Sequence, residues 1–247
     1  MKADPFVQLR LLDLQATDTT LDQLAHRRAT LPEIAELASL EGRLAGLRDE
    51  IVRVSTEDSD LGREQSKIET DVELVQTRAK RDQQRLDSGA VSSPKELENL
   101  QHEIASLGRR QGDLEDQVLE VMEKREEVQG RLAALTAQRD ELLAQQAAAL
   151  ERQSVAFGAI DGDRAKASDE RAVLSAGIPD DLRALYEKVR ASSGGTGAAA
   201  LYRGACQGCR LSLSGQDLAT VRDAPADEVM RCEECRRILV RTGESGL

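Results

Sequence analysis

The segment LASLEGRLAGLRDEIVRV, residues 37–54, decides the fold of most of the chain. It carries Leu, Ile or Val at positions 37, 40, 44, 47, 51 and 54, so apolar side chains recur at alternating spacings of three and four. This heptad pattern is typical of a left-handed coiled coil. Continued to residue 86, the spacing finds apolar side chains at twelve of fifteen positions, and the exceptions are Asp58, Gln65 and Asp82.

A second seam of the same kind covers residues 97–142. Eleven of its fourteen positions are apolar, and the exceptions are Gln111, Arg125 and Arg139. The segment DSGAVSSP, residues 87–94, separates the two seams. Gly89 suits the position after a helix, Ser93 an N-cap and Pro94 the first helical residue. A short loop between two long helices predicts an antiparallel hairpin that turns near residues 88–93.

The register of the hairpin follows if Leu86 lies opposite Leu97, the first seam residue after the loop. Asp58 is then at the level of Arg125 in the other helix. Opposite charges at one level of a seam can fix its register, so we expect an ion pair here. The alternative is that both side chains turn outwards into solvent.

The ends of the hairpin are also marked. The first helix is expected to begin near residue 5 and to kink or break at Pro32, which lacks an N–H and clashes with the preceding turn. The second should end near residue 175, before Ile178-Pro179. We therefore predict a hairpin domain over residues 1–176 and a second domain over residues 177–247 that begins with a helix.

All four cysteines lie in that second domain, as two C-x2-C pairs: Cys206, Cys209, Cys232 and Cys235. Each pair can direct two thiolates at one metal, and two pairs complete the tetrahedron that Zn²⁺ prefers. This predicts one structural zinc ion in a small α/β zinc ribbon, with disulfides or a redox dithiol as the alternatives. Ser214 is expected to cap a short helix between the pairs, with strands near residues 199–203, 229–231 and 238–240.

Composition and charge limit the function. Phe6, Phe157, Tyr186 and Tyr202 are the only aromatic residues, so a large aromatic core is excluded; we expect the four to gather where hairpin and ribbon meet. The net charge of −11 falls entirely on residues 1–175, which disfavours that segment as a nucleic-acid surface. No apolar run reaches membrane-spanning length and no signal peptide is evident, so we expect a cytoplasmic protein.

The sequence resembles a bacterial family of coiled-coil proteins with a C-terminal C4-type zinc ribbon, long described as a domain of unknown function. Besides the cysteines and Ile178-Pro179, the matching stretches are Leu11–Gln15, Ser93–Leu97 and Leu114–Asp116. The resemblance implies an adaptor, because some members are associated with a transcription sigma factor, RNA or flagellar assembly. Arg236 departs from it, because members often carry Gly after the last cysteine, which puts the backbone of the second knuckle in doubt.

These observations predict a non-enzymatic zinc-binding adaptor. The coiled coil would bind a protein partner and the ribbon nucleic acid or transcription-related proteins; a homodimer stays open, and no membrane is involved. The candidate contacts on the ribbon are Arg203, Arg210, Arg231, Arg236, Arg237 and Arg241, and those at the hairpin tip are Arg78, Lys80, Arg81 and Arg85, although ordinary solvated arginine explains either set. The alternative function is a redox- or zinc-responsive chaperone. No phosphate loop, nucleophile elbow or open metal site suggests an enzyme.

Overall fold

The computed structural model describes residues 1–247, and it confirms a mainly α fold with a long helical hairpin and a small C-terminal region that carries the cysteines. The helices are α1 (Pro5–Ala29), α2 (Pro32–Asp87), α3 (Pro94–Ala176), α4 (Asp180–Ser192) and α5 (Gly215–Asp223). The strands are β1 (Ala198–Tyr202), β2 (Ala205–Cys206), β3 (Met230–Arg231) and β4 (Ile238–Val240). None of the helices combines the length and the apolar character needed to cross a membrane.

The chain divides into two compact units, and each is described by itself. The hairpin unit is residues 36–149, and the base unit is residues 1–35 together with 150–247. The boundary predicted between residues 176 and 177 coincides with the end of α3 at Ala176. The boundaries between the two compact units lie instead after residues 35 and 149, because the ribbon shares an apolar core with α1.

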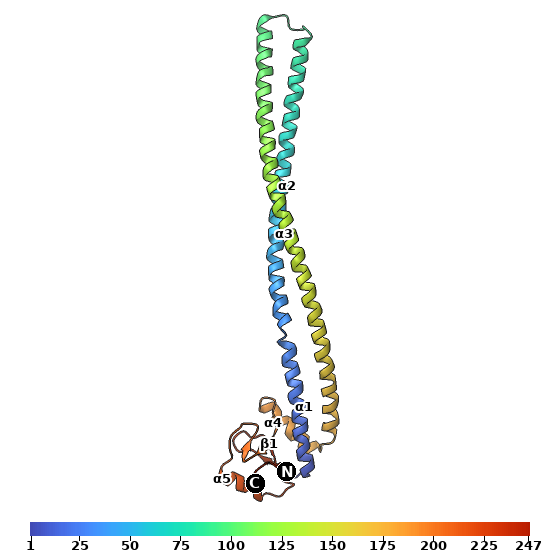
Figure 1. Cartoon of the computed structure of the whole chain (residues 1–247), viewed down its shortest axis with the longest axis vertical. Helices are drawn as coiled ribbons and strands as arrows, with labels where there is room; N and C mark the ends of the chain where they lie inside the picture. Colours follow the sequence, from blue (N-terminus) through green and yellow to red (C-terminus); the bar gives the residue numbers. More distant parts are fainter. The chain divides into compact units, whose positions relative to one another are not determined.

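In the hairpin unit, α2 and α3 run side by side and antiparallel (Figure 1). None of the 29 predicted seam positions is exposed, so both heptad seams are confirmed. Leu40 and Leu47 pack with Leu142 and Ala149 in one buried cluster. A fully buried aliphatic side chain contributes about 1.5–3 kcal/mol, so a seam one residue wide holds the two helices together without a broad core.

Both predicted interruptions of the helices occur where expected. Helix α1 ends at Ala29 and α2 begins at Pro32, so the proline breaks the first arm. At the tip, Gly89 has a φ of +66°, the left-handed conformation that a glycine adopts without steric cost. Pro94 then opens α3.

The predicted ion pair within the seam is confirmed. Arg125 Nε donates to Asp58 Oδ1 across the hairpin at 3.1 Å, and the Gln129 amide donates to the same oxygen at 3.0 Å. These two contacts, with hydrogen bonding to Gln129 the larger cause, hold the pKa of Asp58 below its usual value. Gly62 makes room for the arginine, because a Cβ there would lie 3.3 Å from the guanidinium.

In the base unit, a four-stranded sheet of order β2-β1-β4-β3 separates two apolar clusters. Strands β1 and β4 pair in parallel, and the outer pairs are antiparallel. Side chains alternate between the faces of a strand. One face of the sheet joins α1 and α4 in a core of Leu11, Leu14, Ile178, Leu182, Tyr186, Ala198, Ile238 and Val240. The second cluster lies on the other face and consists of Ala199, Leu201, Cys206, Val221, Cys232 and Leu239.

The beginning of the chain is tied to the ribbon. The Ala3 N–H donates to the Asp227 carbonyl at 2.7 Å, and the Val229 N–H donates to that of Met1 at 3.1 Å. Figure 1 shows both chain ends beside the strands. Asp4 caps α1 by accepting a hydrogen bond from the Phe6 N–H at 2.8 Å. These bonds anchor α1 at its first turn.

The four aromatic residues all belong to the base unit, but they do not form the single cluster that we expected. Tyr186 is fully buried in the core shared by α1 and α4, whereas Phe6 is 77% exposed. The Phe157 ring lies under the guanidinium of Arg28, 4.2 Å from its carbon. Leu, Ile and Ala therefore supply most of this core.

Candidate metal centre

The first cysteine pair forms a tight turn at the end of β2. The Arg210 N–H donates to the Cys206 carbonyl at 2.7 Å, and the Cys206 N–H donates to the Leu211 carbonyl at 3.0 Å. This closes the backbone around Cys206 and Cys209, so both side chains leave the turn on the same side. Arg210 completes the turn with a φ of +64°.

The second pair repeats this geometry after β3. The Arg236 N–H donates to the Cys232 carbonyl at 2.8 Å, and the Cys232 N–H donates to the Arg237 carbonyl at 2.9 Å. Arg236 has a φ of +58°. Arg236 therefore adopts the left-handed conformation in which family members often have glycine. For a non-glycine residue this conformation costs about 1–2 kcal/mol. The knuckle backbone is preserved.

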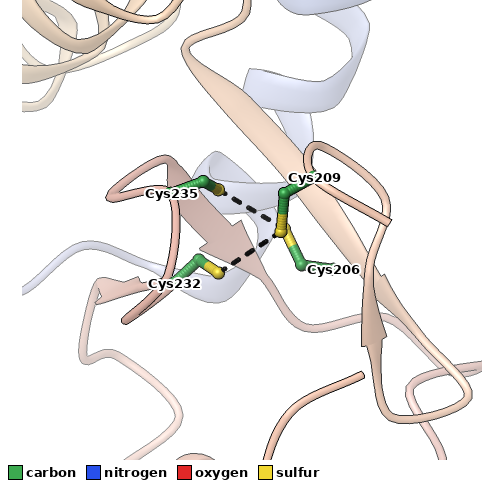
Figure 2. A group of neighbouring side chains, drawn as sticks. All are labelled: Cys206, Cys209, Cys232 and Cys235. Atoms are coloured by element: carbon green, nitrogen blue, oxygen red, sulfur yellow. Dashed lines mark hydrogen bonds between the residues drawn. The ribbon is translucent and has the colours of Figure 1, made fainter. Parts of the chain in front are cut away.

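The four sulfur atoms converge on one point, as Figure 2 shows, and all lie within 4.8 Å of one another. Two sulfur–sulfur distances, Cys206–Cys235 and Cys209–Cys232, are 3.9 Å. A tetrahedral zinc ion with Zn–S bonds of about 2.3 Å requires sulfurs roughly 3.8 Å apart. A disulfide bond would be about 2.05 Å long, so the thiols are free and the disulfide alternative is excluded. The residues present fit one zinc ion with four protein ligands.

The surroundings of the thiols affect their protonation. Burial raises the pKa of Cys206 and raises that of Cys232 to about 12. Burial acts in the same direction on Cys235, but hydrogen bonds from the Arg237 backbone and side chain, and from Cys232 and Cys209, lower its pKa to about 7. Because zinc binds thiolates, metal binding to this centre releases protons.

Arg237 connects the two knuckles to the rest of the base unit. Its side chain passes over Gly208, where a Cβ would meet the Arg237 Cδ at 2.7 Å. Its guanidinium donates to the carbonyls of Ser193 at 2.7 Å and Thr196 at 3.2 Å, in the turn between α4 and β1. Contacts from residues just outside the ligands, such as these, orient the ligands of a metal. Arg237 thus holds the centre against the end of α4.

Residues 14–194 match the model of the CT398-like coiled coil hairpin domain, and residues 205–239 match that of the C4-type zinc ribbon domain. The chain belongs to the CT398-like coiled-coil hairpin family. The ribbon match contains all four cysteines, so the centre is a C4 zinc site able to hold one zinc ion. This confirms the predicted cofactor.

Relatives within the family cover nearly the whole chain. The chain is 38% identical over 241 residues to an uncharacterized protein of Mycobacterium tuberculosis, with 98% of each chain covered. A solved structure from Mycobacterium smegmatis matches with a TM-score of 0.87 at 33% identity, over 98% of this chain and 100% of that one. The structure of CT398 from Chlamydia trachomatis shares the fold, with a TM-score of 0.70 at 19% identity over 96% and 98% of the two chains.

The structure divides the six predicted ribbon arginines into two groups. Arg237 and Arg241 maintain the fold: Arg241 donates to the carbonyls of Val221, Ala224, Pro225, Ala226 and Glu228. Arg231 donates to the Arg236 carbonyl, and Arg236 pairs with Glu233 at 3.3 Å. Arg203 lies over the Tyr202 ring, and the exposed Arg210 has no side-chain partner. Only Arg203 and Arg210 keep guanidinium groups without a carbonyl or carboxylate partner.

The arginines predicted at the hairpin tip are partly neutralised. Arg78 pairs with Glu103 and lies 3.9 Å from Asp82, and Arg81 lies 3.7 Å from the same carboxylate. Asp82 is only 3% exposed. Lys80 and Arg85 form no ion pair, so the tip offers less positive charge than its composition predicts.

A buried polar network in the base unit was missed by the sequence reasoning. Asp18, 1% exposed, accepts hydrogen bonds from Arg171 Nε at 2.6 Å and from the Tyr186 hydroxyl at 2.7 Å. Gln15 accepts from the same hydroxyl at 3.1 Å and from the Gly197 N–H at 2.6 Å. The only sequence signal is that Gln15 and Asp18 occupy the core-facing side of α1.

Proposed function

We propose that this protein is a non-enzymatic zinc-binding adaptor: the zinc ribbon stabilises the base unit, and the coiled coil binds a protein partner. The observation that carries the proposal is that all four cysteines direct their sulfurs at one point, where they would supply a zinc ion with all four of its ligands. Such a centre leaves no position for a substrate and contributes folding energy instead.

The connections of the ribbon support a structural role for zinc. The sheet shares its core with α1, and Arg237 links the knuckles to the end of α4. Zinc binding is thus coupled to the packing of the base unit. The hairpin unit has no comparable cluster of ligating side chains, and its outer faces are solvent-exposed.

Site-specific crosslinking tests the adaptor function. A photoreactive residue is placed singly along exposed positions of α2 and α3, and singly on the ribbon, in the full chain purified with zinc. We expect one protein partner to crosslink reproducibly at hairpin positions in lysate of the cells that make the protein. Absence of any reproducible crosslink, with or without added zinc, would contradict the proposal.

We further propose that the ribbon binds nucleic acid, and Arg203 and Arg210 are the arginines that support this proposal. If each contacts a phosphate, the double variant R203Q/R210Q lowers the salt slope of binding by about two. Filter binding to RNA and DNA over a salt series measures this, with Arg48→Gln as the control because Arg48 is 82% exposed on the hairpin unit. Binding without a steep salt slope would rule out phosphate recognition.

The redox- or zinc-responsive chaperone is the second candidate, because Cys209 and Cys235 are half-buried and lie within reach of solvent. Mild peroxide would then release zinc and expose apolar surface from the base unit. Zinc release followed with a chromophoric chelator tests it, and retention of zinc under peroxide would favour the adaptor.

A further inference from the structure

The charge of the hairpin unit is concentrated in one zone. Residues 57–73 and 113–127, here called the acidic belt, hold fourteen Asp and Glu against four Lys and Arg. The whole hairpin unit holds 25 and 16, so the rest of it is nearly neutral. The two segments lie side by side, because Arg125 bonds both Asp58 and Gln65 across the hairpin. The net charge of the protein is therefore largely the charge of this belt.

An open apolar groove of about 490 Å³ lies at the edge of the acidic belt. It is lined by Glu69, Val72, Glu73, Gln76, Glu115, Val118 and Leu119. Val72 and Val118 are seam residues, and their short side chains fill the space between the helices less completely than leucine would. Leu119 stands beside them and is 58% exposed, so it adds solvent-accessible apolar surface to the groove.

The rim of the groove carries carboxylates that no cation neutralises. Glu69 is bonded only by the amide of Gln65, at 2.8 Å, and Glu115 by those of Gln111 and Gln76, at 2.7 and 3.4 Å. Glu73 makes no ion pair. Elsewhere in the belt, Glu120 pairs with Lys124. The combination is an apolar floor framed by free negative charge.

We propose that this groove binds a basic amphipathic helix of a protein partner. The apolar side of such a helix would cover Val72, Val118 and Leu119, and its Lys or Arg side chains would pair with Glu69, Glu73 and Glu115. Helix-in-groove recognition uses anchors spaced three and four residues apart, and complementary charge sets orientation and association rate. The inference rests on the proposed adaptor function and specifies the chemistry of the partner.

Other occupants fit the groove less well. A second copy of this chain would bring two acidic belts together, and nucleic acid would meet the same repulsion. A metal ion needs converging oxygens, and the four cysteines are the only group of three or more ligating side chains that converge in this structure. A cationic helix satisfies both the apolar floor and the charged rim.

Peptide binding to the full, zinc-loaded chain tests the proposal. The probe is a fluorescent Leu/Lys peptide of about 18 residues, roughly five helical turns, with leucines on one face. Its controls are a scrambled peptide of identical composition and the same helix with Glu in place of Lys. We expect the amphipathic basic peptide to bind at least about tenfold more tightly than the scrambled one, and the acidic one not to bind.

Two matched substitutions locate the site. Leu119→Gln should weaken the peptide about fivefold or more, because an apolar anchor is lost. Leu74→Gln, at a leucine that is 64% exposed on the same unit but outside the groove, should leave affinity unchanged. Both positions are exposed, so neither change should impair folding, and circular dichroism of each variant checks this.

Three outcomes would overturn the inference: equal binding of the scrambled peptide, equal effects of the two leucine substitutions, or no binding of the basic helix. Equal binding of the scrambled peptide would mean that the acidic belt attracts any cationic peptide and does not recognise an amphipathic helix. The adaptor function is judged separately by crosslinking: a partner that crosslinks to the Leu119→Gln chain as strongly as to the wild type would leave the adaptor intact and refute the groove as its binding site.

Discussion

Arg237 passes directly over Gly208, and the two residues belong to opposite knuckles of the zinc centre. The contact is close enough that a single methyl group at Gly208 would lie 2.7 Å from the Arg237 Cδ. Arg237 also donates to the Ser193 carbonyl at the end of α4. Because Gly208 has no side chain, Arg237 can lie against the first knuckle and connect it to the helices of the base unit.

Gly208→Ala should therefore destabilise the ribbon. The methyl group forces Arg237 to move, and overpacking of this kind costs about 1–3 kcal/mol. We expect faster zinc transfer to a chromophoric chelator and a lower melting temperature. Gly215→Ala is the control, because nothing lies within 4 Å of a Cβ there. Equal zinc retention in both variants would show that Arg237 adapts without loss.

Arg210→Gly and Arg236→Gly should each stabilise the zinc-loaded protein by about 0.5–1 kcal/mol, because glycine adopts a positive φ without strain. The Arg236–Glu233 pair that is lost is solvent-exposed and contributes little. Thermal unfolding in excess zinc measures the change. The same substitution within helix α5, Arg222→Gly, should be destabilising by about 1 kcal/mol. If all three variants lose stability, the left-handed positions carry no strain.

Zinc affinity should increase with pH. The raised pKa values of Cys206 and Cys232 keep both thiols protonated in the metal-free protein near neutral pH, so binding displaces at least two protons. Each displaced proton changes the logarithm of Kd by about one per pH unit. Below about pH 7 the Cys235 thiol is protonated as well, and the dependence becomes steeper. Chelator competition between about pH 6 and 8 checks this, and a flat profile would contradict it.

Tyr186→Phe should destabilise the base unit by about 1–2 kcal/mol, because the hydroxyl bonds both Asp18 and Gln15 inside the core. Burial, and then the neighbouring Asp18 carboxylate, raise the pKa of Tyr186 well above its usual range, so the hydroxyl stays a donor at any working pH. Urea unfolding measures the loss. Tyr202→Phe is the matched control and should change stability little, because no hydrogen bond to its hydroxyl occurs in the structure. Equal losses would mean that the hydroxyl of Tyr186 has no special role.

The Asp58–Arg125 pair should weaken in acid. The pKa of Asp58 is lowered in the folded protein, so its stabilising contribution is complete above the usual value of 3.8 and is lost as pH falls through the folded value. Asp58→Asn should therefore differ from the wild type at neutral pH and converge with it in acid. Thermal unfolding over this range tests the pair, and a difference independent of pH would assign the effect to packing alone.

Local patterns in the sequence predicted the helices, the break at Pro32, the turn at Gly89 and the zinc ligands. Each depends on residues that are neighbours along the chain or recur at a fixed period, such as Cys206 and Cys209. The Asp58–Arg125 pair could also be predicted, because fixing one pair of facing residues in a continuous coiled coil fixes which residues face each other along its whole length.

What the sequence by itself determined is thus the hairpin and the C4 zinc site, because heptad periodicity and ligand spacing are local properties. Only the tertiary structure decided how the ribbon is held to α1, and which arginines are available for partners. Asp18 accepts a hydrogen bond from Arg171, 153 positions away in the sequence. Arg241 donates to backbone carbonyls of a turn that only folding brings close to it. Such contacts have no period and no fixed spacing, since packing of the sheet against α1 and α4 creates them.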